Sequence, residues 1–140
     1  RHAWPPAVQT IEIAVPDGPV LAGQTAFVAI RWERAGTERV GRPLKARVAL
    51  YAAGDSRKAQ ADERILNDRH LMPDEWGPED QPLNVYRVET PADLAPGQYD
   101  LRLLVYDADT LEPLELVDEA GNPAGIEATI GTVEIEAATP

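Results

Sequence analysis

Side chains that could attack a substrate are scarce in this sequence of 140 residues. Nucleophilic catalysis needs a hydroxyl or a thiol that a neighbouring base activates. The chain has no cysteine, its one serine is Ser56 in a predicted GDSR turn, and its histidines are His2 and His70. Thr90 and Thr110 occupy a predicted strand end and a predicted turn, so neither replaces that serine easily. The sequence therefore argues against a Ser56–His70 hydrolase and excludes thiol chemistry.

Carboxylates, in contrast, are plentiful, and two of them on opposed loops could hydrolyse a glycoside. The candidates for such a pair are Asp62, Asp74, Glu75, Asp107 and Asp109. With 24 aspartates and glutamates in the chain, however, abundance singles out no pair. Surface carboxylates also keep an acidic protein soluble. An acid-pair hydrolase therefore stays an open alternative without an assigned pair.

Acidic turns are a possible source of oxygen ligands for calcium. The segments YDADT, which contains Asp107–Asp109, and DEAGN each offer a cluster of oxygens. Neither has the spaced ligands of an EF-hand loop, which favours Asx-type turns, and calcium at Asp107–Asp109 is left open. Zinc is disfavoured because His70 has no well-placed histidine or cysteine partner. We predict no metal and no cofactor.

Aromatic rings could form a platform that stacks on a sugar while polar neighbours bind its hydroxyls. The candidates are Trp4, Trp76, Tyr86 and Tyr106. Trp76 has the most weight because it lies in an irregular segment where strand periodicity does not demand a large ring. The competing interpretation is that this ring pins the segment onto the fold. Tyr99, two residues after Pro-Gly, is typical of a structural corner tyrosine.

The elements that must position these side chains are predicted to be strands. Period-two alternation recurs along the chain, and no stretch keeps a helical spacing of apolar residues beyond two turns. The predicted strands cover residues 7–15, 24–34, 44–53, 57–65, 83–91, 98–106, 111–118 and 126–137. Seven or eight mostly antiparallel strands separated by turns indicate an all-β fold, and an immunoglobulin-like β-sandwich better than a barrel.

Alternation also predicts which side chains fill the core. The polar strand RKAQADERI is expected at a sheet edge, where its charges would protect against pairing. The expected inward residues are Val8, Ile11, Ile13 and Val15; Val28, Ile30 and Trp32; Leu44, Ala46, Val48 and Leu50; Tyr99, Leu101, Leu103 and Val105; and Ile130, Val133 and Ile135.

The length fits a single domain over residues 1–140. Residues 1–7 are predicted to form a flexible N-terminal segment. Residues 66–82, rich in proline and acid, are predicted to form a long crossover loop between two sheets, and connections of this length tend to be functional or mobile.

The formal net charge of −11 repels phosphate backbones and anionic lipid headgroups. Because the basic residues are interleaved with apolar or acidic ones, we predict no nucleic-acid partner and no membrane-surface binding. No run reaches the about 18 apolar residues of a membrane span. The chain begins at Arg1 rather than at methionine, so we expect a trimmed piece whose signal peptide or anchor is missing.

The run from Trp76 onward carries a family resemblance. WGPE, followed by YRVETPADLAPGQYDLRLLVYDADT, resembles a C-terminal β-sandwich of bacterial polytopic membrane proteins of glycosyltransferase type. ALYAAGDSRKAQAD, which ends in Gln60 and Asp62, is similar to that family's strand, turn and Q-x-D ending. The resemblance covers about residues 18–136. It implies an extracytoplasmic accessory domain, and it carries over no catalytic residue.

The sequence therefore predicts a non-enzymatic, extracytoplasmic accessory or interaction domain of a larger bacterial protein. A missing anchor or parent domain would supply any link to the membrane. The partner is expected to be a protein or a glycan that the sequence does not specify. The alternative is a carbohydrate-binding module whose ligand-binding residues are Trp76, Tyr86, Gln60 and Asp62.

Overall fold

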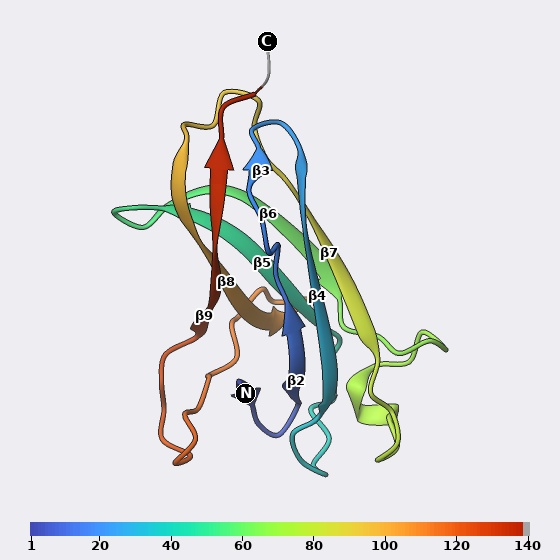
Figure 1. Ribbon diagram of the computed structural model, residues 1–140. Helices are drawn as coiled ribbons and strands as arrows, with labels where there is room; N and C mark the ends of the chain where they lie inside the picture. Colours follow the sequence, from blue (N-terminus) through green and yellow to red (C-terminus); the bar gives the residue numbers. More distant parts are fainter. Residues whose placement is uncertain (139–140) are drawn as a thin grey trace.

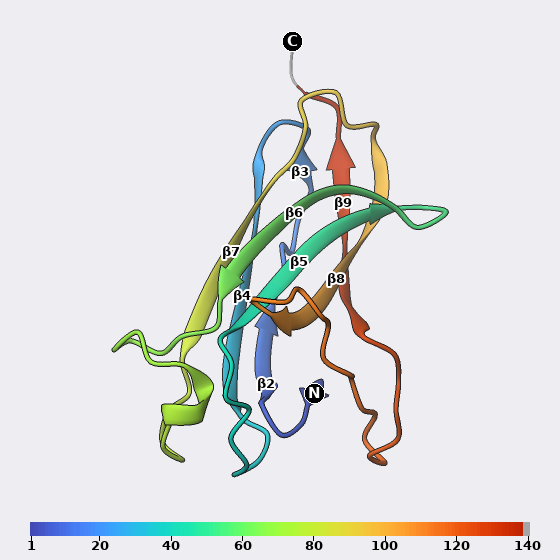
Figure 2. The same ribbon diagram turned by 180° about the vertical axis from the view of Figure 1, so that it is seen from behind.

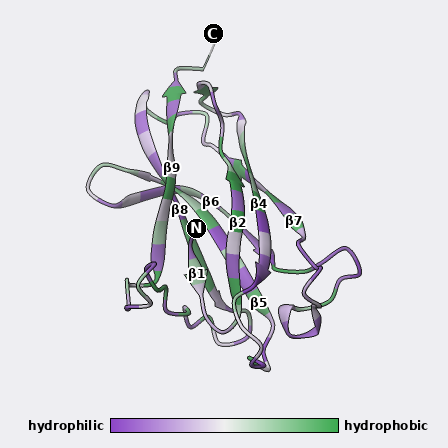
Figure 3. Ribbon diagram, turned by 60° about the horizontal axis from the view of Figure 1, so that its bottom comes forward, coloured by the Kyte–Doolittle hydropathy of each residue, from purple (hydrophilic) through white to green (hydrophobic). Residues whose placement is uncertain are grey.

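Alternating apolar and polar residues form extended strands throughout the computed structural model, which describes residues 1–138. Figure 3 shows hydrophobic and hydrophilic bands following one another along these strands. A single 3-10 turn, η1 (Pro73–Glu75), interrupts them. The strands are β1 (Ala3–Trp4), β2 (Val8–Ala14), β3 (Val20–Leu21), β4 (Thr25–Arg34), β5 (Leu44–Ala52), β6 (Ser56–Arg64), β7 (Leu83–Glu89), β8 (Gly97–Asp107) and β9 (Glu127–Glu136).

The strands form two sheets that pack face to face. One sheet has the order β1-β2-β4-β7 and the other the order β3-β9-β8-β5-β6. Figure 1 shows β2, β4 and β7 in front, and Figure 2 shows β5 and β6 in front. All pairs are antiparallel except β3 with β9. The larger sheet follows the G-F-C-C′ order of immunoglobulin-like domains, so the predicted all-β, immunoglobulin-like sandwich is confirmed.

The core lies between the sheets and contains the residues that alternation predicted for the central strands. Val28, Ile30 and Trp32 of β4 are fully buried against the inward residues of β5 and β8. Burying one such side chain contributes about 1.5–3 kcal/mol to folding. The rings of Trp4 and Trp32 pack at a centroid distance of 6.1 Å. Trp32 is therefore a packing residue, as expected.

A β-bulge changes the predicted face of the first long strand. The register of β2 against β4 shifts between Thr10 and Glu12, so Ile11 is the extra residue. Thr10 turns inward instead, and it is buried while Ile11 is only half-buried. The Thr10 hydroxyl accepts a hydrogen bond from the backbone N–H of His2 at 3.0 Å. This bond satisfies a buried polar group and ties the N-terminal residues to β2.

The N-terminal residues, predicted to be a flexible segment over 1–7, are packed into the sandwich. Ala3 and Trp4 form β1, which pairs with Gln9 and Val8 of β2. Trp4 and Ala7 are both completely buried. The physical reason is the large apolar surface of Trp4, which fills the core beside Trp32. Trp4 is consequently no part of an exposed sugar platform.

The predicted strand over residues 111–118 is wrong. Pro113 and Val117 make only isolated bridges, to Tyr106, Ala3 and Pro123, and the segment is otherwise an irregular loop. Pro113 explains this, because a residue without an N–H cannot continue a hydrogen-bonded ladder. In β9 the register also shifts, and Ile130 is left between paired residues and half-buried, whereas Val133 and Ile135 are buried as predicted.

The crossover connects the edge strands of the two sheets. β6 is the outer strand of the larger sheet, which confirms the predicted edge position of RKAQADERI. Residues 66–82 then lead from β6 to β7, the outer strand of the smaller sheet. The crossover and the loop between β4 and β5 lie at the same end of the sandwich, away from the end of β9 (Figure 1).

Candidate functional site

The crossover is held by side chains that accept hydrogen bonds from its own backbone. Asn67 is buried, and its Oδ1 accepts the N–H groups of Arg69 and Leu71 at 3.0 and 2.9 Å. Asp80 Oδ2 accepts the N–H of Gly77 at 2.7 Å. Asparagine and aspartate often stabilise turns in this way. The segment therefore has a defined shape although it contains no strand.

Asp74 joins the crossover to the loop between β4 and β5. Its carboxylate is buried and accepts the backbone N–H groups of Val40 and Gly41, each at 2.7 Å. Burial alone would raise the pKa of Asp74, but the two N–H bonds and the nearby guanidinium groups of Arg39 and Arg34 lower it overall. The side chain is thus an ionised anchor between two loops, and not one half of an acid pair.

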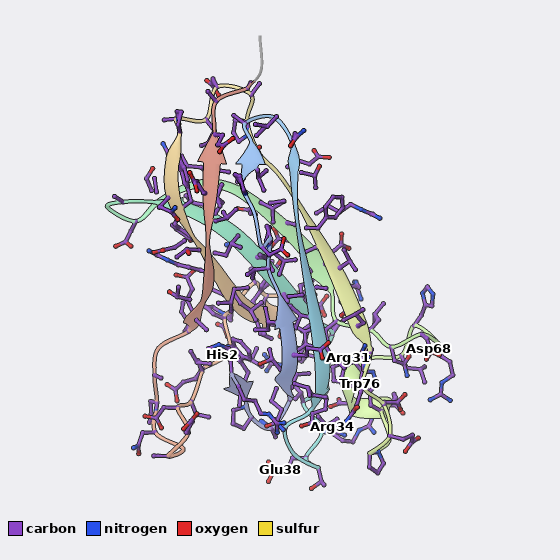
Figure 4. The ribbon with its side chains drawn as sticks, in the orientation of Figure 1. His2, Arg31, Arg34, Glu38, Asp68 and Trp76 are labelled. Carbon is purple, nitrogen blue, oxygen red and sulfur yellow. The ribbon has the colours of Figure 1, made fainter. Side chains whose placement is uncertain are left out.

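A pocket of about 420 Å³ opens between these two loops. One wall comes from the end of β4 and the residues after it, and the other from the crossover. Figure 4 shows Arg34 and Trp76 together at this end of the molecule. The residues that line the pocket are Glu33, Arg34, Ala35, Gly36, Thr37, Trp76, Gly77 and Pro78.

Arg34 lines this pocket and contacts both of the loops that form it. Its guanidinium donates to the backbone oxygens of Glu38 at 2.6 Å and Asp74 at 3.3 Å, and it lies 3.9 Å from the Asp74 carboxylate. Its Nε is buried and has no hydrogen-bond partner among the described residues. The guanidinium therefore fixes the positions of the two loops relative to each other.

Trp76 lines the pocket, but most of its surface is covered. The residue is only 5% exposed, and its indole N–H donates to the backbone oxygen of Leu71 at 2.8 Å. The ring thus pins the crossover onto the sandwich, which was the competing structural interpretation. An open stacking platform at Trp76 is not formed, although Trp76 is among the residues that line the pocket.

Tyr86, the second aromatic candidate, lies in the core. It is completely buried on β7, and burial raises the pKa of its hydroxyl far above the usual value, opposed in part by the neighbouring Trp32 indole. Neither the Tyr86 hydroxyl nor the Trp32 Nε1 has a partner of good hydrogen-bond geometry within residues 1–138. The structure therefore does not bring Tyr86 to a surface where it could contact a ligand.

Gln60 and Asp62, the polar candidates, lie in the other sheet, on the outer face of β6. Asp62 accepts hydrogen bonds from Gln60 Nε2 at 2.7 Å, from Arg47 Nε at 3.0 Å and from the Tyr106 hydroxyl at 2.7 Å. The Arg47 guanidinium covers the Tyr106 ring at 5.4 Å from its centroid. The four side chains form a closed network across β6, β5 and β8, separate from the Trp76 pocket.

The pKa values of this network follow from the same contacts. Burial would raise the pKa of Asp62, but the bonds from Tyr106, Arg47 and Gln60 outweigh it and lower the value. Burial and the bond to Asp62 raise the pKa of Tyr106 to about 12. At neutral pH the carboxylate is therefore charged and the phenol is neutral. This four-residue network was not predicted from the sequence. The alternation of residues that places Arg47 and Asp62 on the outer faces of their strands could have indicated it.

The remaining reactive candidates do not meet. Ser56 begins β6, which extends about 26 Å from Ser56 to Arg64, and His70 lies in the crossover beyond the far end of this strand. Asp107 accepts the N–H groups of Asp109 and Thr110 and an N–H of Arg42, and these contacts lower its pKa. This is the Asx-type turn that the sequence favoured. Within residues 1–138 no three acidic or histidine side chains gather as a metal site.

Comparisons with known proteins add no family assignment. No protein-family model matches the chain, and no curated protein matches it. A CARDB domain from Pyrococcus furiosus, solved with di-metal ions, is 18% identical over 94% of this chain and 89% of that one, with a TM-score of 0.46. A Bacteroides fragilis chain assigned as a β-galactosidase is 16% identical over 86% of this chain, with a TM-score of 0.40.

The chain spans only 16% of the length of that second protein. The glycosyltransferase-type membrane context implied by the sequence resemblance stays a prediction. Among the described residues, no helix combines the length and the apolar character needed to cross a membrane.

Proposed function

We propose that this chain is a non-enzymatic accessory domain that acts outside the cytoplasm as part of a larger bacterial protein. The observation that carries the proposal is how its protected carboxylates are used. Asp62, Asp74 and Asp107 each accept at least two hydrogen bonds from groups that shape a loop or join strands. Carboxylates engaged in this way are ionised anchors, whereas a general acid needs a raised pKa.

Turnover assays test the non-enzymatic part of this proposal. The purified chain is incubated with a panel of nitrophenyl glycosides and nitrophenyl esters at pH 5, 6 and 7, and we expect rates equal to the buffer blank. A D62N and a D74N variant serve as matched controls. Turnover by the wild-type chain that either substitution abolishes would overturn the proposal, because one of the carboxylates would then be catalytic.

The location is supported by the family resemblance and is tested separately. In the native host, protease added to intact cells is expected to degrade the domain, while a cytoplasmic marker protein survives. Protection of the domain until the cells are lysed would contradict an extracytoplasmic position.

A second candidate function is binding of a saccharide unit in the pocket beside Trp76. The favouring observation is the pocket itself, because Trp76, two glycines and polar side chains such as Glu33 and Thr37 surround a volume of about 420 Å³. Ligand pockets of proteins typically have volumes of about 300–1,000 Å³ and combine apolar walls with a few polar groups. Such a pocket suits a single sugar ring better than a long flat chain.

Isothermal titration calorimetry with a panel of bacterial cell-wall and plant oligosaccharides tests this candidate. We expect that T37F, which fills the pocket mouth, abolishes any binding found for the wild type. The matched control is T129F, because Thr129 is an exposed threonine on the outer face of β9. Binding that T129F removes and T37F leaves intact would place the sugar elsewhere, and no heat across the panel would dismiss the candidate.

A further inference from the structure

The outer face of the β2-β4-β7 sheet carries apolar side chains that no part of residues 1–138 covers. Phe27, Leu83 and Val85 are 55%, 47% and 46% exposed, and they are three of the five large hydrophobic residues that are exposed in the described chain. A sheet face in contact with water normally carries polar residues. Clustered exposed apolar residues of this kind mark contact surfaces.

The strand register shows that these residues form one patch. Ala29 of β4 lies between Ala14 of β2 and Val85 of β7, in adjacent strands. Phe27 is two residues along β4 on the same face, and Leu83 is two residues along β7 in the opposite direction. We call these five residues, Ala14, Phe27, Ala29, Leu83 and Val85, the outer patch.

The rim of the outer patch is charged in a self-complementary way. Arg31 pairs in register with Glu12 at one end, at 3.9 Å between charged atoms, and Arg87 pairs in register with Phe27 at the other end. Glu89 follows Arg87 on the same face of β7. The charges of these two arginines and two glutamates cancel at the rim, whereas the whole chain has a formal net charge of −11. Electrostatic repulsion between two copies is therefore small at this face.

We propose that the outer patch is the interface of a two-fold symmetric dimer of this chain. Glu12 and Arg87 occupy diagonally opposite corners, with Ala29 between them. The two-fold axis lies in the plane of the interface, passes over Ala29 and runs at right angles to the line from Glu12 to Arg87. It therefore places Glu12 of one copy over Arg87 of the other, at two symmetric positions. The same operation carries the large Phe27 toward the small Ala14 of the second copy, which is the pairing that close packing needs.

A second copy is favoured over an unrelated partner by this diagonal arrangement. An acidic or a basic partner would meet one attractive and one repulsive corner, whereas an identical face meets two attractive ones. None of the five outer-patch residues lines the Trp76 pocket, and the pocket residue Glu33 lies two residues beyond the rim residue Arg31 on β4. Because the outer patch has five residues, against the roughly 20–30 that each partner contributes to a stable interface, the dimer is a weak one.

Sedimentation velocity over a concentration series up to about 1 mM tests the proposal. We expect the weight-average sedimentation coefficient of the wild type to rise with concentration, and F27K/V85K to stay monomeric. L111K is the matched control, because Leu111 is also exposed but lies in the loop after β8. Far-UV circular dichroism confirms that each variant is folded, which is expected because both patch residues point away from the core.

Charge exchange gives a second and more specific test. E12R and R87E are each expected to raise the dimer dissociation constant at least about tenfold, since either change places like charges at both corners. The double variant E12R/R87E restores opposite charges across the axis and should recover most of the wild-type affinity. Only a two-fold interface of this register predicts recovery within one chain.

Several outcomes would overturn the inference. A wild-type chain that stays monomeric over the whole series excludes the dimer. Association that F27K/V85K leaves intact and L111K abolishes places the interface elsewhere. A double charge exchange that is no better than the single variants contradicts the proposed axis, and association only with a different protein would assign the patch to that partner.

Discussion

The Tyr106 hydroxyl donates a 2.7 Å hydrogen bond to the Asp62 carboxylate, which lies two strands away across β5. The bond joins the central strand β8 to the edge strand β6 over the side chain of Arg47. An edge strand made of polar residues has little apolar surface to hold it in place. The network at Asp62 therefore adds side-chain contacts to the backbone ladder that joins β6 to β5.

We predict that Y106F lowers the free energy of unfolding by about 1–2 kcal/mol, because a hydrogen bond to a charged acceptor is lost in a mostly buried position. Urea unfolding followed by tryptophan fluorescence measures the change. Y51F is the control: the Tyr51 hydroxyl makes only a long, 3.3 Å bond to Glu127, so its removal should change the stability less. Equal effects of the two variants would contradict a special role for Tyr106.

The lowered pKa of Asp74 gives stability a defined dependence on pH. A carboxyl group whose pKa is lower in the folded than in the unfolded state stabilises the fold above its unfolded pKa. This contribution is lost as the pH falls through the folded pKa. The stability difference between wild type and D74N should thus be fully present at pH 6 and should shrink in acid, below about pH 4.

Urea unfolding of both proteins between pH 2 and pH 7 measures this difference. D68N is the matched control, because Asp68 lies in the same crossover but is exposed. A difference between wild type and D74N that is constant over the whole range would show that the charge of Asp74 does not hold the two loops together.

Trp4 is expected to be one of the most sensitive positions of the chain. Its side chain is completely buried against Trp32, so W4A removes a large ring and leaves a cavity. We predict a loss of about 3–5 kcal/mol in the free energy of unfolding, measured by chemical unfolding. R1A, which changes an exposed residue two positions before β1 begins, should have little effect. A small loss in W4A would mean that the N-terminal residues are not part of the cooperative fold.

Tyr99 gives a further test of the fold. Its hydroxyl donates to the backbone oxygen of Ala95 at 2.5 Å, as in the corner tyrosine of immunoglobulin-like domains. Y99F retains the buried ring and loses only this bond, so we predict a loss of about 0.5–1.5 kcal/mol in unfolding free energy. An unchanged stability of Y99F would show that the ring alone holds the corner.

The strands and the core could largely be predicted because alternation reports directly on burial. Val28, Ile30 and Trp32 all face the core, as their spacing indicates. The prediction that Ile11 faces the core is wrong because a β-bulge adds a residue to the strand without changing the hydrophobic pattern of the sequence. The strand predicted over 111–118 is wrong because the apolar residues around Pro113 alternate as in a strand, whereas Pro113 itself prevents a continuous ladder.

The candidate site was harder to predict, because it depends on contacts between distant segments. Trp76 was identified as important, but sequence cannot distinguish a ring that pins a loop from a ring that faces a ligand. The partners of Asp74, the N–H groups of Val40 and Gly41, are backbone groups with no residue type to reveal them. Gln60 and Asp62 were singled out through the resemblance, while their companions Arg47 and Tyr106 required the strand register.

The direction of β9, which ends at Glu136, decides how the protein should be immobilised. That strand ends at the pole of the molecule opposite the crossover, whereas the N-terminus lies on the crossover side (Figure 1). A biosensor chip or bead coupled through a linker after β9 would display the Trp76 cavity outward, toward the solution. Coupling through Arg1 would hold the same cavity near the support, so the attachment point should be chosen before any screen for ligands.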